Sequence, residues 1–165
     1  MGTVFKGNTS ITKFNEFYFF ENSNVPGNCF QGCTALREVS TPKNLVSVVG
    51  GTSSFKNNSN MVVYFNEGYQ SLPYSSFGAG NSNVTLILPT TLTEIRSGAF
   101  YDGSGYILVV KATTPPNPGA VPNSRVTKVY VPDSSIDVYK ASWTDVATKI
   151  YPISQYEGSI VSPVW

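Results

Sequence analysis

The stretch LILPTTLTEIRSGAF, residues 86–100, contains apolar residues at spacings that fit neither a regular strand nor a regular helix. After Pro89 come Leu92, Ile95 and Phe100, at intervals of three, three and five residues. Other parts of the chain repeat this arrangement, because phenylalanines recur at intervals of 25, 22 and 23 residues: Phe30, Phe55, Phe77 and Phe100. The stretch is therefore one copy of a degenerate unit of about 23 residues.

The residues on either side of these phenylalanines repeat as well. An aliphatic residue lies five positions before three of them, at Val25, Leu72 and Ile95. A strand-like run begins six residues after each of the four, and these runs cover residues 36–42, 61–67, 83–89 and 106–112. A single unit cannot bury its own apolar face, so we expect stacked units that share one core and align their phenylalanines in a ladder.

Two stretches carry a resemblance to a known family: residues 86–100, quoted above, and VPGNCFQGCTALREVSTPKNLVSV, residues 25–48. Both resemble the leucine-rich repeats of the BspA-like type, which are common in surface proteins of Bacteroides-like bacteria and read roughly L-x-x-I-x-L-P-x-x-L-x-x-I-x-x-x-A-F-x-x-C. The unit at 55–77 departs from this pattern, because Asn66 and Glu67 stand where Leu-Pro is expected. The resemblance covers about residues 11–153 and is specific for a fold, but not for a function.

The fold predicted from these observations is mainly β with short helical or irregular returns. It is a leucine-rich-repeat solenoid of about four units of roughly 23 residues, with a C-terminal capping helix. The predicted segments are an N-terminal lead-in (1–24), the repeats (25–111), a Pro-rich connector (112–127), a terminal strand with the capping helix (128–153) and a tail (154–165).

The capping helix is predicted from apolar residues that alternate at spacings of three and four, which places them on one helical face: Ile136, Tyr139, Trp143, Val146 and Ile150. Ser134 or Ser135 is the expected N-cap, because it follows the strand that ends at Pro132. A helix of this kind would cover the open end of the stack, as repeat arrays require.

Composition and charge exclude several classes of function. The 165 residues suit one domain, and only 13% of them are charged, about half of the usual share. The net charge is +1 without runs of like charge, so we expect no nucleic-acid partner. No apolar run approaches the roughly 18 residues of a membrane span, so we expect no membrane insertion. The start of the chain has no apolar signal-peptide core, so either the protein is not exported by that route, or the sequence is a mature form or a fragment.

Residues for catalysis are sparse. The absence of histidine excludes Ser-His-Asp, Cys-His and His-metal arrangements. Cys29 and Cys33 cannot complete a zinc site alone, and two small residues near a repeat turn, a disulfide or a redox pair remain open. The carboxylates do not fall at equivalent repeat positions, so no pair is expected to act on a glycoside. We therefore predict no enzymatic activity, no metal and no cofactor.

A partner interface is the better expectation. In the repeat register, strand positions eight and ten after each phenylalanine should point outward. Applied to the later units, this predicts an exposed apolar stripe with these members: Val63, Phe65, Ile87, Leu108 and Val110. Such a stripe marks a contact with a partner or with another copy of the chain. A register slip by one residue would remove the stripe, as would a connector or a tail (154–165) that folds over it.

Tyrosines in turns offer a second candidate. Tyr74 and Tyr101 fall in turns instead of strands, so their rings could stand in solvent as stacking platforms for sugars.

The family resemblance implies a non-catalytic binding or adhesion module of a bacterial surface or secreted protein, which recognises a protein or a glycan. An alternative is a structural or receptor-binding fibre or tail protein in the virion of a phage that infects Bacteroides-like bacteria. That alternative predicts self-association, as a trimer. A glycan-active enzyme is the weakest hypothesis.

Overall fold

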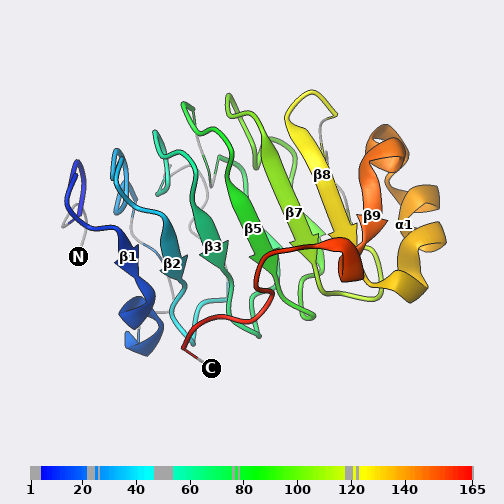
Figure 1. Ribbon diagram of the computed structural model, residues 1–165, viewed down its shortest axis with the longest axis horizontal. Coiled ribbons are helices and arrows are strands. Elements are labelled where there is room, and N and C mark those ends of the chain that lie inside the picture. The colour runs from blue at the N-terminus through cyan, green and yellow to red at the C-terminus, as the bar shows by residue number, and fades with distance from the viewer. Residues whose placement is uncertain are drawn as a thin grey trace.

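A computed structural model of the protein describes residues 5–21, 25, 27–46, 54–75, 77, 79–117, 121 and 123–164. Over these residues most strands form one parallel sheet of seven, in which each strand lies beside the strand of the next repeat (Figure 1). The strands of this sheet, in spatial order, are β1 (Lys13–Phe14), β2 (Glu38–Ser40), β3 (Val62–Tyr64), β5 (Thr85–Leu88), β7 (Tyr106–Val110), β8 (Val126–Val131) and β9 (Ile150–Pro152). The four strands predicted from the repeat are β2, β3, β5 and β7, and their positions are confirmed.

The sheet extends beyond the predicted repeats at both ends. β1, in the predicted lead-in segment, pairs in register with β2, while β8 and β9 continue the sheet past β7. One row of aligned residues faces the core on every strand of this sheet: Phe14, Val39, Val63, Leu86, Leu108, Val129 and Ile150. In-register parallel pairing of equivalent residues is what stacked leucine-rich-type repeats require.

The return segments form a second, smaller sheet. β4 (Ser71–Leu72) pairs in parallel with β6 (Glu94–Ile95). The predicted Pro-rich connector continues this pairing, because Asn117 bridges to Glu94 and accepts a 2.9 Å hydrogen bond from the backbone N–H of Ile95. The connector therefore takes the place of a return segment in spite of its unusual composition.

The predicted phenylalanine ladder is present in the core, except that Phe77 and Phe100 are joined through the ring of Tyr106. Phe30 stacks on Phe55 with ring centroids 5.4 Å apart. Phe5, one repeat earlier, extends the ladder because it stacks on Phe30 at 5.5 Å. At the other end the ring of Tyr106 lies next to both Phe77 and Phe100, at 6.2 and 4.9 Å, and continues the aromatic row.

The irregular unit at 55–77 is stabilised by a buried side chain. The Asn66 amide donates hydrogen bonds of 3.0, 3.0 and 2.9 Å to the carbonyls of Lys43, Leu45 and Glu67, and its Oδ1 accepts one of 3.0 Å from Thr41. These bonds satisfy backbone carbonyls of the preceding turn, which are costly to bury without partners. Asn66 therefore replaces the expected leucine by a polar network that joins two repeats.

A short helical cap closes the C-terminal end of the sheet (Figure 1). The α-helix α1 (Ile136–Ser142) is shorter than predicted, and it is flanked by the 3-10 helices η2 (Asp133–Ser135) and η3 (Thr144–Lys149). Two more 3-10 turns are η1 (Asn15–Phe19) after β1 and η4 (Ile153–Gln155) after β9. Ser135 is the N-cap residue, although its side chain makes no capping hydrogen bond.

Four of the five residues of the predicted apolar face are buried and Ile136 is partly buried, and two members of this face anchor the connector. The Tyr139 hydroxyl donates a 2.8 Å hydrogen bond to the carbonyl of Ala112, and the Trp143 indole N–H donates one of 3.0 Å to that of Pro116. Both rings are almost fully buried. The cap therefore holds the Pro-rich connector against the end of the sheet.

Candidate binding surface

The predicted exposed stripe on the outer sheet face is wrong. Val63, Phe65, Leu108 and Val110 are buried at 0–1% exposure in the main core. The error arises because the inward-facing strand residue lies nine positions after Phe30 but eight after Phe55 and Phe100, and a slip of one residue inverts every side chain of a strand. These four side chains are thus part of the core and cannot form a partner interface.

The outer face does carry an apolar row, but with other members. Ile87 is the one residue of the predicted stripe that points outward, and it too is buried, at 1% exposure. The row runs across four neighbouring strands: Tyr64, Ile87, Val109 and Tyr130. Ile153 and Tyr156, from the segment after β9, pack on this row and cover it.

The C-terminal tail crosses the outer face from β9 back towards β2, as Figure 1 shows. The hydroxyls of Ser162 and Ser40 form a 2.8 Å hydrogen bond that joins the tail to β2. Ser159 shares a hydrogen bond with the Tyr64 hydroxyl, and Tyr156 shares one with Thr85. Burial raises the pKa of the Tyr64 phenol, as expected for a ring under this cover. The tail therefore closes the sheet face that the sequence predicted to be open.

Tyr74 and Tyr101 are exposed, as predicted from their turn positions. They lie after β4 and β6 respectively, and 50% and 49% of their surface is accessible. Their ring centroids are 6.0 Å apart and the ring planes are inclined by 38°. The structure thus brings the two predicted residues of neighbouring repeats together into one exposed aromatic pair.

A glycine positions this pair. The ring of Tyr74 lies against Gly98, where an added Cβ would come within 2.5 Å of the ring carbons. Gly98 also has a φ of +74°, which side chains other than glycine rarely adopt. The close approach of the ring to the Gly98 backbone restricts the position of Tyr74 next to Tyr101.

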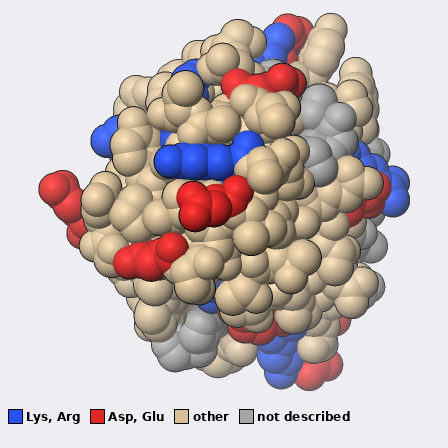
Figure 2. Space-filling view, turned by 90° about the vertical axis from the view of Figure 1, so that its right-hand side faces the viewer, with Lys and Arg blue, Asp and Glu red and all other residues tan. Residues whose placement is uncertain are grey.

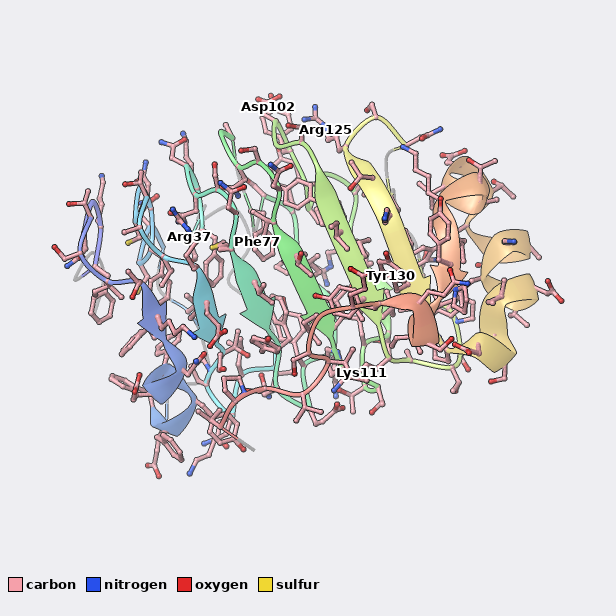
Figure 3. The ribbon with its side chains drawn as sticks, viewed as in Figure 1. Arg37, Phe77, Asp102, Lys111, Arg125 and Tyr130 are labelled. Atoms are coloured by element: carbon pink, nitrogen blue, oxygen red, sulfur yellow. The ribbon has the colours of Figure 1, made fainter. Side chains whose placement is uncertain are left out.

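A second aromatic site lies on the outer face at the C-terminal end and was not predicted. Tyr130 of β8, Tyr151 of β9 and Tyr156 of the tail surround a hollow of about 390 Å³. The ring centroid of Tyr130 lies 5.9 Å from that of Tyr151 and 5.2 Å from that of Tyr156. Figure 3 shows Tyr130 beside the start of the tail. Sequence alternation could have identified Tyr130, because it lies between the inward-facing Val129 and Val131.

Cys29 and Cys33 are buried free thiols. Burial, with the neighbouring Cys33 as a second cause, raises the pKa of the Cys29 thiol to about 11. Burial also raises the pKa of Cys33, whose thiol donates a 2.9 Å hydrogen bond to the carbonyl of Phe5. In the described part of the chain, no group of three or more Cys, Asp or Glu side chains is placed to hold a metal ion.

The model of the BspA type leucine rich repeat region matches residues 3–114 in six copies. The chain belongs to this family. The match contains more copies than the roughly four units predicted, and it includes most of the predicted lead-in segment. Members of this family are repeat modules that present a surface for binding other proteins. No curated protein sequence matches the chain.

Two further observations describe the surface. In the part of the chain that the structure describes, no helix is long and apolar enough to cross a membrane. Figure 2 shows the end of the molecule that α1 caps, where acidic and basic side chains are interspersed. Mixed charge of this kind gives no single-sign patch on that end to attract a polyanion.

Proposed function

We propose that this chain is a non-catalytic binding module, built as a leucine-rich-repeat solenoid, of a bacterial surface or secreted protein. Its partner is an extracellular protein, and the Tyr74–Tyr101 pair is the centre of the contact. The observation that carries this proposal is the pairing of two half-exposed tyrosine rings 6.0 Å apart. Tyrosine is among the residues that most often dominate the energy of protein interfaces.

The construction of the pair supports a role in binding. The rings come from successive repeats, and Tyr74 is held against Gly98, so little side-chain freedom remains to be lost when a partner binds. On β6 and directly after it, in the repeat of Tyr101, Glu94 and Arg96 form a 2.8 Å ion pair. An aromatic centre with a polar rim is the usual arrangement of a protein–protein contact.

In the residues that the structure describes, one ground for the virion alternative is removed, namely an exposed apolar stripe that would drive self-association. Four members of the stripe belong to the core, and the outer row that contains Ile87 lies under the tail.

Surface plasmon resonance with purified extracellular-matrix proteins on the chip tests the proposal. The double variant Tyr74→Ala, Tyr101→Ala should bind at least about tenfold more weakly than the wild type, or roughly 1.4 kcal/mol. Phe19→Ala is the matched control, because this ring is also exposed, at 60%, but lies on η1. If wild type and double variant bind equally, the tyrosine pair is not the contact. If the wild type binds none of the matrix proteins, the adhesive role is contradicted.

A further inference from the structure

The tyrosine hollow between β8, β9 and the tail has the properties of a small-ligand site. Its volume of about 390 Å³ falls in the range of about 300–1,000 Å³ that small-molecule pockets occupy. Tyr130 is 8% exposed and forms the floor, while Tyr151 is 36% exposed and forms one wall. This site is made by other elements than the Tyr74–Tyr101 pair, so its function does not depend on that of the pair.

Polar groups with free hydrogen-bonding capacity surround the rings. The side chains of Gln155 and Glu157 line the hollow and make no hydrogen bond to any residue that the structure describes. Lys128 lies on β8, two residues before Tyr130, with its Nζ over the Tyr151 ring at 6.0 Å from the ring centroid, and makes no ion pair within that part of the chain. A ligand that enters the hollow would therefore find the Glu157 carboxylate as an acceptor, the Lys128 ammonium group as a donor, and the Gln155 amide, which can donate and accept.

The chemistry of the lining selects the ligand. A purely apolar ligand would leave the carboxylate and the ammonium group desolvated without partners. A strongly charged ligand would be attracted by one of Lys128 and Glu157 and repelled by the other. A sugar ring, in contrast, has C–H faces that pack on aromatic rings and hydroxyls that both donate and accept hydrogen bonds.

We propose that this hollow binds a neutral saccharide. One sugar ring stacks on Tyr151 above the floor formed by Tyr130. The Glu157 carboxylate accepts hydrogen bonds from sugar hydroxyls, and Lys128 and Gln155 donate to them. Because Tyr156, Glu157 and Gly158 belong to the tail, the tail completes the site as well as covering the apolar row.

Titration of the ¹⁵N-labelled full chain with neutral trisaccharides, followed by NMR, tests this proposal. The probes are maltotriose, cellotriose and mannotriose, with a sulfated disaccharide as the charged comparison. We expect saturable shifts for at least one neutral probe, largest at the backbone amides of residues 128–131 and 151–158. Tyr151→Ala should weaken the binding at least tenfold and Glu157→Gln several-fold, whereas Phe19→Ala, which removes an exposed ring on η1 outside the hollow, should leave it unchanged.

Three results would overturn the proposal. The first is the absence of shifts with every neutral probe, and the second is binding of the sulfated probe alone. The third is binding that neither Tyr151→Ala nor Glu157→Gln weakens, which would place the sugar elsewhere. Glu157→Gln changes one exposed side chain of the same size, so it keeps the test valid even if Tyr151→Ala disturbs β9.

Discussion

The phenyl rings of Phe55 and Phe77, one repeat apart, stack with their centroids 5.2 Å apart and their planes inclined by 13°. Both residues are 0% exposed, so each ring contacts the core of its own repeat and that of its neighbour. Phe77 also meets Tyr106 edge to face, which joins a third repeat to the row. The stability of each repeat therefore depends on its neighbours, as expected for a stacked array.

Replacement of one ladder member should be strongly destabilising. Phe77→Ala removes a fully buried ring that has contacts on both sides, and we expect a loss of about 3–5 kcal/mol in the free energy of unfolding. Urea denaturation measures this loss, with Phe19→Ala as the exposed control that should change stability by less than about 0.5 kcal/mol. A loss under about 1 kcal/mol for Phe77→Ala would contradict the ladder.

The contact between Gly98 and Tyr74 can be tested by two alanine substitutions. Gly98→Ala combines a positive φ with a clash against the Tyr74 ring, whereas Gly7→Ala has a similar φ of +72° and meets nothing within 4 Å. Strain at such a φ costs about 1–3 kcal/mol at either position, so the clash should make Gly98→Ala the more destabilising. Equal losses of unfolding free energy for the two variants would show that the ring does not lie on the glycine.

Stability should depend on pH through Glu67. Burial tends to raise its pKa, but hydrogen bonds from Lys111 and Thr90 and the charge of Lys111 together hold the pKa below its ordinary value. A lowered pKa means that the interaction stabilises the fold above the unfolded pKa of 4.5 and is lost as the pH falls through the folded value. Glu67→Gln should therefore be less stable than the wild type at neutral pH.

The pH dependence of the stability difference between the wild type and Glu67→Gln tests this explanation. Because Glu67 is half exposed, we expect a small difference in the urea midpoint at neutral pH, which closes as the pH falls below 4.5. A difference that stays constant as the pH falls well below 4.5 would mean that the carboxylate charge is not its cause.

The two cysteines should be unreactive in the folded protein. Burial raises the pKa of both thiols, for Cys29 to about 11, so little thiolate forms near pH 8. A thiol-reactive dye should label both residues rapidly in denaturant and very slowly without it. Fast labelling of the native chain would contradict the burial of this pair.

The repeat, its strands and most of its phenylalanine ladder could be predicted from the sequence because they follow a regular period. The face of each strand could not be predicted from the phenylalanine positions alone. Val39 lies nine residues after Phe30 but Val63 lies eight after Phe55, and the extra residue belongs to a turn that leaves no periodic signal. One extra residue in the turn before a strand moves every side chain of that strand to the opposite face of the sheet.

The C-terminal part shows a second limit. The buried face with Tyr139 and Trp143 was predicted correctly, but the α-helix ends at Ser142. The Trp143 indole bonds to Pro116, a contact across 27 residues that no local pattern contains. The packing of Tyr156 on Tyr130 is likewise a long-range contact, which is why the tyrosine hollow was missed.

The most direct test of the account is the solution mass, by light scattering after size exclusion, of a chain that ends at Ser154. This truncation removes Tyr156 and the rest of the tail and exposes the apolar row of Tyr64, Ile87, Val109 and Tyr130. The control is a chain that ends at Ser162, which keeps the hydrogen bond to Ser40. We predict that the full chain, at 17.9 kDa, and the control each have the mass of one copy, while the shorter chain self-associates through its uncovered face. A shorter chain that remains as monomeric as the full one would contradict a tail that covers an apolar sheet face.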